Sequence, residues 1–313
     1  MDVASPSNVR RPPIMQEDEA FSAVAIGKLC AHPRFPDALR RVLSGSVRYF
    51  HGNRILNQIG YDRGRLVISI LAYYLHVSRR PDDPSSGLTA NGIKSLCIEQ
   101  DVCSPGRARA LLSLMRLFGY IATAPSAADR RLKLLMPTDL LVASLRERWD
   151  LLFESIALVL PETAAARAAL DGPDFLPAFV RHIVDQYRTG VRPLDFAAPL
   201  RPFAERNAGL IILFSLAIAG EPDDTVPPMR PVQISISDLA RRFGVSRAHV
   251  LRLLRDGAAE GFITRAATEK DAKVTFQPAL AHAIHVWIAT VFLLFAHCSR
   301  AALAEIDRAG HNA

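Results

Sequence analysis

The hydrophobic positions of this chain recur at helical spacing over much of its length. Apolar residues three and four apart predict helices, whereas short runs rich in β-forming residues are few. Four segments carry the helical pattern most clearly: Arg65–Val77, Ala108–Phe118, Leu140–Leu160 and Phe175–Tyr187. The pattern therefore predicts a mainly α fold with only short β-hairpins.

One predicted hairpin follows the second of these helices. Two short β-like runs, GYIAT and LKLLM, are separated by a stretch that contains Pro125 and Ser126. Proline and serine favour a turn, so the two runs predict antiparallel strands. The tip of the hairpin would carry the charged triplet Asp129, Arg130 and Arg131.

The residues before this hairpin predict a helix-turn-helix. A short helix is expected at about Ser95–Gln100, and Ser104 with Pro105 is typical of the start of the next helix. Two helices followed by a hairpin with a basic tip is the order of a winged helix, in which the second helix enters the major groove of DNA. A surface hairpin with two arginines is more often a solvated turn, so this interpretation needs a second observation.

That observation is an internal repeat. When the sequence is aligned with itself without gaps so that Ser104 matches Ser246, identical residues fall at key positions of the helix-turn-helix and its hairpin. These positions are helix caps, buried helix positions and the glycine that ends the second helix. The other pairs matched by this shift are Ser95 with Ser237, Leu111 with Leu253, Leu112 with Leu254, Gly119 with Gly261, Ile121 with Ile263, and Asp129 with Asp271. A weaker match at a slightly smaller shift pairs Pro33 with Pro173, Phe35 with Phe175, Ala38 with Ala178, and Arg41 with Arg181.

The repeat predicts how the chain is organised. After a disordered lead-in at residues 1–20, we expect a first half at 21–160 with a winged helix at about 65–138. A second half is expected at 161–313, with a winged helix at about 207–278. The two modules are expected to be related by a pseudo-twofold axis. Between them would pack the long apolar helices that follow the two wings, Leu140–Leu160 and Ala279–Ala302.

The second half supplies a resemblance to a known family. Its motifs SDLA, FGVSR, VLRLL and EGFI, within Ser237–Phe276, resemble the winged helix-turn-helix of MarR-type bacterial transcription regulators. The resemblance implies a protein that binds double-stranded DNA, in which helices outside the winged domain join two subunits. The first twenty residues lack the apolar core of a signal peptide, which predicts a cytoplasmic protein. A tandem chain would hold both halves itself and would act as a monomeric pseudo-dimer on an imperfect palindrome.

The resemblance also implies which residues face DNA. In the second half these are Ser246, Arg247, His249 and Arg252 on the recognition helix and Lys270 and Lys273 in the wing. In the first half they are Ser104 and Arg107 on the helix and Arg130 and Arg131 in the wing. Pro105 stands where the second half has Arg247, and Ala110 where it has Arg252, so the first recognition helix is poorer in donors. The divergence fits an asymmetric operator or a copy that has partly lost DNA binding.

Composition and motif searches reduce the number of functional classes that fit the sequence. The net charge of +7 is a mild excess that favours nucleic acid only where the basic groups cluster. Metalloprotease, dinucleotide-binding and phosphate-loop motifs are absent, so we expect no enzyme, metal or cofactor. His282 and His285 lack a supporting ligand, and the four cysteines show no paired spacing, which favours free thiols. The apolar run Val286–Ala296 is too short to span a bilayer and predicts a buried helix.

Two other functions fit a tandem winged helix: a replication initiator of the plasmid type and a scaffold that binds protein. A small-molecule effector, if one exists, is expected in the seam between the modules. Tyr73, Tyr74, Trp149 and Trp287 are its candidate lining residues, although aromatic residues on apolar helices are more often part of the core.

Overall fold

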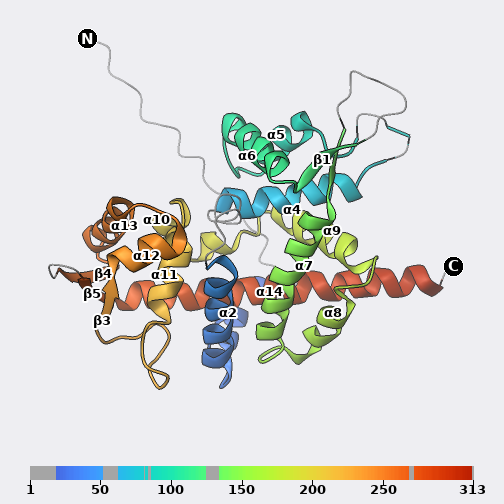
Figure 1. Ribbon diagram of the computed structural model, residues 1–313. Helices are drawn as coiled ribbons and strands as arrows, with labels where there is room; N and C mark the ends of the chain where they lie inside the picture. Colours follow the sequence, from blue (N-terminus) through green and yellow to red (C-terminus); the bar gives the residue numbers. More distant parts are fainter. Residues whose placement is uncertain are drawn as a thin grey trace, which may run out of the picture.

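The protein is mainly helical and carries two small antiparallel sheets, as the hydrophobic pattern predicts. The computed structural model describes residues 19–51, 63–80, 82–83, 86–124, 134–267 and 271–311. Figure 1 shows the long helix α14 running across the molecule, with the remaining elements arranged along it. One continuous hydrophobic core joins residues from both halves of the chain.

The elements of the first half run from a short 3-10 helix to the long helix that follows the hairpin. They are η1 (Glu19–Phe21), α1 (Ala23–Cys30), α2 (Phe35–Phe50), α4 (Arg63–Val77), α5 (Ala90–Glu99), α6 (Pro105–Leu117), β1 (Ile121–Thr123), β2 (Leu135–Pro137) and α7 (Asp139–Ile156).

The elements of the second half begin with the same order and add short helical turns before α11. They are η2 (Pro161–Thr163), α8 (Ala164–Ala169), α9 (Phe175–Arg188), η3 (Pro193–Phe196), η4 (Ala198–Leu200), α10 (Arg201–Ala204), α11 (Gly209–Ala217), β3 (Val232–Ser235), α12 (Ile236–Phe243), α13 (Arg247–Ala259), β4 (Ile263–Ala267), β5 (Asp271–Phe276) and α14 (Pro278–His311).

The two sheets differ in size. In the second half β5 lies between β3 and β4 and pairs antiparallel with both, in the order β3-β5-β4. In the first half β1 pairs antiparallel with β2. The Leu135 N–H on β2 also donates to the Leu88 carbonyl at 2.9 Å, just before α5, where the second half has its strand β3. In the described part of the first half, this hydrogen bond therefore takes the place of the third strand, which in the second half is β3.

Helices of the two halves pack on one another in matching pairs. Helix α2 contacts α11, and α9 contacts α4. Helix α1 contacts α14, and α8 contacts α7. Each half also packs its own long helix, because α2 contacts α7 and α9 contacts α14. Each of these contacts thus has a counterpart in which the roles of the two halves are exchanged.

An aromatic cluster lies where these helices meet. It joins Trp149 and Phe153 of α7 with Phe175 and Phe179 of α9 and Phe295 of α14, and all five side chains are buried. The Phe179 ring lies 5.0 Å from Trp149 and 5.2 Å from Phe295, measured between centroids, with tilted or edge-on geometry. The two long helices expected to pack together are thus in contact, through Trp149 and Phe153 against Phe295.

Helix α14 is longer than its apolar core suggests. The expected apolar run Val286–Ala296 lies inside a helix of 34 residues, which continues through the flanking histidines. By length and composition α14 could cross a membrane, but 61% of its most apolar window is buried inside the protein. Packing within the protein thus accounts for much of its hydrophobicity.

Candidate nucleic-acid interface

The second half contains a tightly built helix-turn-helix. The Ser235 hydroxyl caps α12 by accepting from the Asp238 N–H at 3.3 Å, and the Ser246 hydroxyl caps α13 by accepting from the His249 N–H at 3.1 Å. Gly244, at φ 65°, ends α12 in the left-handed conformation that glycine adopts without strain. The Val245 N–H then donates to the Ala240 carbonyl at 3.0 Å and closes the turn.

The first half repeats this construction with different residues. The Ser104 hydroxyl caps α6 through the Arg107 N–H at 3.4 Å. Asp101, at φ 49°, takes the left-handed position of Gly244, and the Val102 N–H donates to the Cys97 carbonyl at 2.9 Å. The turn from Asp101 to Ser104 is one residue longer than the turn from Gly244 to Ser246. The first turn therefore holds an extra residue, which the gap-free match did not contain.

The hairpins also differ in length. Gly119 and Gly261, at φ 76° and 72°, end the second helix of each unit in the same conformation. Ile121 pairs with Pro137 in the first hairpin, and Ile263 pairs with Phe276 in the second. The chain between the paired residues is therefore three residues longer in the first hairpin than in the second.

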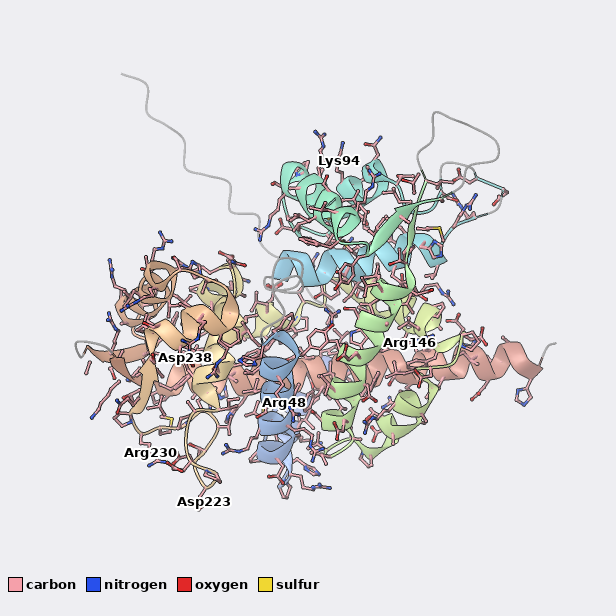
Figure 2. The ribbon with its side chains drawn as sticks, in the orientation of Figure 1. Arg48, Lys94, Arg146, Asp223, Arg230 and Asp238 are labelled. Carbon is pink, nitrogen blue, oxygen red and sulfur yellow. The ribbon has the colours of Figure 1, made fainter. Side chains whose placement is uncertain are left out.

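Helix α13 presents a row of arginines to solvent. Arg247, Arg252 and Arg255 are exposed, and none of them makes a hydrogen bond or ion pair with another described residue. The opposite face is buried as expected, through Val250, Leu253 and Leu254. On α12, by contrast, Asp238 accepts from both Arg241 and Arg242 at 2.7 Å (Asp238 is labelled in Figure 2). Of these two helices, α13 is thus the one whose exposed arginines have no acidic partner among the described residues.

Helix α6 also carries exposed arginines. Arg107 and Arg109 are exposed, and Arg116 donates to the Thr123 hydroxyl at 3.3 Å. Lys94 adds a charge on the outer surface of the preceding helix α5 (Figure 2). The sequence comparison missed Arg109 because its counterpart in the second half is Leu251, so only its place on the exposed face of the helix reveals it.

His249 has a structural partner. Its Nε2 lies 2.7 Å from the Asn207 carbonyl oxygen, in the turn before α11. Arg206 beside it forms an ion pair with Asp256, further along α13. Two contacts from one turn therefore hold α13 in position. His249 thus has a structural role, and its contact with DNA stays a prediction. Ser104 and Ser246, also predicted to face DNA, are exposed but use their hydroxyls as caps.

The wings are described only in part. Arg130, Arg131 and Lys270 lie outside the described residues. Lys273 lies on β5 and is exposed, between the buried side chains of Ala272 and Val274. The alternation of a strand thus directs one of the predicted wing cations outward.

The cysteines and histidines show packing roles in the described part of the chain. None of the four cysteines is in a disulfide, and burial, with Cys103 beside it, raises the pKa of Cys97 to about 12. The Nε2 of His285 lies 2.6 Å from the Val226 carbonyl oxygen, and its ring packs edge-on against Phe35. Among the described residues no group of three or more His, Cys, Asp or Glu side chains could hold a metal ion.

The candidate residues for such an interface are Arg247, Arg252 and Arg255 on α13 and Arg107 and Arg109 on α6, all of them exposed. Comparison with known proteins adds no name to this arrangement, because no family model, no curated protein and no solved structure matches the chain.

Proposed function

We propose that this protein is a double-stranded DNA-binding transcription regulator built from two tandem winged helices that act as an intramolecular pseudo-dimer. The observation that carries the proposal is the row of exposed arginines without acidic partners among the described residues on α13, the second helix of a capped helix-turn-helix. Guanidinium groups suit both phosphate and guanine, and the second helix of such a unit is the one that enters the major groove.

The tandem arrangement is supported by the exchange of contacts between the halves. In a twofold-symmetric dimer, a contact of residue i with residue j is accompanied by the contact of j with i. The pairs α2 with α11 and α9 with α4 have this relationship within one chain, and so do α1 with α14 and α8 with α7. The shared caps Ser104 and Ser246 and the left-handed Gly119 and Gly261 add local support.

The two units would divide the work unequally. Helices α13 and α6 each carry three exposed arginines, but on α6 Arg116 lies in the last turn and donates to the Thr123 hydroxyl. Helix α6 also begins with Pro105, where α13 begins with Arg247. The second unit would therefore read bases, and the first would contribute mainly phosphate contacts. The expected binding site is an imperfect palindrome with one half better defined than the other.

Binding to DNA of random sequence tests the proposal first. We expect binding that weakens steeply with salt, because contacts with phosphates release counterions. Arg247→Gln and Arg252→Gln should each cost about 1–3 kcal/mol where a base contact is lost, or lower the salt slope by about 0.9 where a phosphate contact is lost. Arg48→Gln is the matched control, because Arg48 (labelled in Figure 2) is an exposed arginine on α2, a helix of the other half of the chain.

The outcomes separate the competing functions. Absence of salt-dependent binding, or wild-type affinity in both α13 variants, would refute the proposed interface and leave the protein-binding scaffold as the better explanation. Where binding occurs, selection of sites from a random duplex library followed by genomic footprinting distinguishes promoters from a replication origin. Recovery of origin sequence alone would favour the replication initiator.

A further inference from the structure

A cavity of about 250 Å³ lies between the two halves of the chain. Its walls come from α2, α4, α7, α9, α11 and α14, together with the segment around η3, so neither half encloses it alone. The lining is mostly apolar and rich in rings, including Trp149, Trp287, Phe50, Phe214 and Phe295. Of the four aromatic residues predicted to line a seam, the two tryptophans do so. Tyr73 is buried elsewhere in the core, and the Tyr74 hydroxyl accepts from Arg188.

One charged group in this wall lacks a partner among the described residues. Arg148 of α7 lines the cavity and makes no hydrogen bond or ion pair with any of them. Two nearby acids of α7 are already paired, because Asp150 accepts from Arg167 at 2.6 and 3.0 Å and Glu154 pairs with Arg41 at 2.5 Å. Glu147, the residue before Arg148, is exposed and forms no ion pair with it. Burial lowers the pKa of Arg148, and the neighbouring Tyr49 opposes this effect only in part.

The other cation of the wall is in use. Arg192 donates to the Gln100 carbonyl at 3.0 Å, and its guanidinium carbon lies 6.0 Å from the centre of the Tyr187 ring. The Tyr49 hydroxyl lies 2.8 Å from the Ser144 hydroxyl and 3.2 Å from the Ser144 carbonyl oxygen. Arg148 is therefore the cavity-lining cation available to an anion. A half-buried guanidinium without a counter-ion is costly, and a bound carboxylate would relieve that cost.

The position of the cavity indicates how many ligands it takes. Helix α7 begins at Asp139 and its counterpart α14 begins at Pro278. When the two helices are aligned at these first residues, three residues of α7 that line the cavity match three residues of α14 that also line it. The pairs are Arg148 with Trp287, Trp149 with Ile288, and Leu152 with Val291, and all six residues line the one cavity. The cavity therefore lies across the pseudo-twofold axis that relates the two halves. This step rests on the proposed tandem arrangement. Divergence has placed a cation on one side and an indole on the other, which suits one ligand with unlike ends.

We propose that this cavity binds one small aromatic carboxylic acid per chain, with its carboxylate paired to Arg148 and its ring among the aromatic side chains of α2, α11 and α14. An apolar cavity of about 150 Å³ holds benzene, so the larger volume here accommodates a substituted ring with its acid group. The flat, ring-rich wall favours an aromatic body over a flexible chain.

Calorimetric titration with 4-tert-butylbenzoate tests the site directly. We expect saturable binding with one site per chain, and much weaker binding of the uncharged 4-tert-butylbenzamide and of octanoate. The chain has two tryptophans and both line the cavity, so their fluorescence should change on binding. Failure of the acid to bind, or equal binding of the amide, would overturn the carboxylate site. Octanoate binding as tightly as the aromatic acid would overturn its preference for a ring.

Variants of the arginine complete the experiment. Arg148→Met should reduce the affinity for the acid roughly tenfold to a hundredfold, as the loss of a charge-assisted pair does, and Arg148→Lys should retain part of it. The thermal midpoint of ligand-free Arg148→Met should equal or exceed that of the wild type, because a half-buried unpaired charge is removed. Arg48→Met, on the exposed side of α2, is the control and should bind normally. Unchanged affinity in a folded Arg148→Met protein would refute the assignment.

This experiment is independent of the proposed DNA binding. The titration needs no DNA, and Arg148 lies on α7, a different helix from α13 and α6, which carry the arginines of the proposed DNA interface. If the protein binds the acid but not DNA, the ligand site is supported and the proposed transcription regulator is refuted. Binding of DNA but not of the acid would lead to the reverse conclusion.

Discussion

At the scale of single residues, some side chains act on their near neighbours and others join distant parts of the chain. The Ser104 and Ser246 hydroxyls act locally, because each caps the helix that follows it. The His249 ring instead lies 2.7 Å from the carbonyl oxygen of Asn207, far earlier in the chain. Arg148 likewise lines a cavity whose walls come from both halves.

His249 gives a prediction that separates positioning from readout. His249→Ala removes the hydrogen bond to the Asn207 carbonyl, so the free energy of unfolding should fall by about 1 kcal/mol. Urea denaturation measures this, and Arg247→Ala is the control that should leave stability nearly unchanged, because Arg247 is exposed. The sequence preference of DNA bound by His249→Ala should stay the same. A relaxed preference with unchanged stability would return His249 to the set of base contacts.

At the scale of elements, helix boundaries near strong local signals were predictable and the exact register of the repeat was not. The predicted helix Ala108–Phe118 falls within α6 and its turn, and the hairpin after it exists. The gap-free match did not show the extra residue in the first turn. In that turn Asp101 takes the left-handed conformation that glycine usually supplies, so no glycine marks the end of the helix in the sequence. The predicted helix Ala279–Ala302 lies inside α14, which begins one residue earlier and continues to His311 through a more polar segment that the apolar pattern does not mark.

The contact between α9 and α14 provides a prediction about pH. Glu305 of α14 accepts from Arg181 at 2.6 Å and lies 2.9 Å from Nε2 of His182. Burial raises the pKa of Glu305, but the hydrogen bonds and charges of Arg181 and His182 outweigh it and hold the pKa below its ordinary value. A carboxyl group with a lowered pKa in the folded state stabilises the protein above its unfolded pKa, and this stabilisation is lost as pH falls through the folded value.

Glu305→Gln should therefore be less stable than the wild type at neutral pH, and the difference should shrink as the pH falls below about 4. Thermal unfolding across this range measures the effect. Glu205→Gln is the control, because Glu205 is an exposed carboxylate that makes no ion pair with another described residue. A stability difference that is constant with pH would show that the ion pair is not its source.

At the scale of the whole molecule, the helices of each half are covered mainly by the other half. The predicted boundary at residues 160 and 161 falls in the turn between α7 and η2, so a cut there would break no described helix or strand. Yet α2 would lose α11, α4 would lose α9, and α1 would lose α14. The aromatic cluster would also be divided, because Trp149 and Phe153 lie on one side of the cut and Phe179 and Phe295 on the other. The repeat in the sequence indicated two similar parts, but it could not show that their cores are one.

This arrangement predicts how separated halves behave. Residues 1–160 and 161–313 expressed alone should each expose the large apolar surface that the partner covers, and should aggregate or form homodimers. Expressed together they should copurify as a one-to-one complex, because the exchanged contacts α2 with α11 and α9 with α4 do not need the chain to be continuous. Phe179→Ala in the second fragment should weaken this complex, since Phe179 contacts rings from both fragments. Two stable, folded monomers that ignore each other would show that the halves are independent domains and would remove the structural basis of the pseudo-dimer.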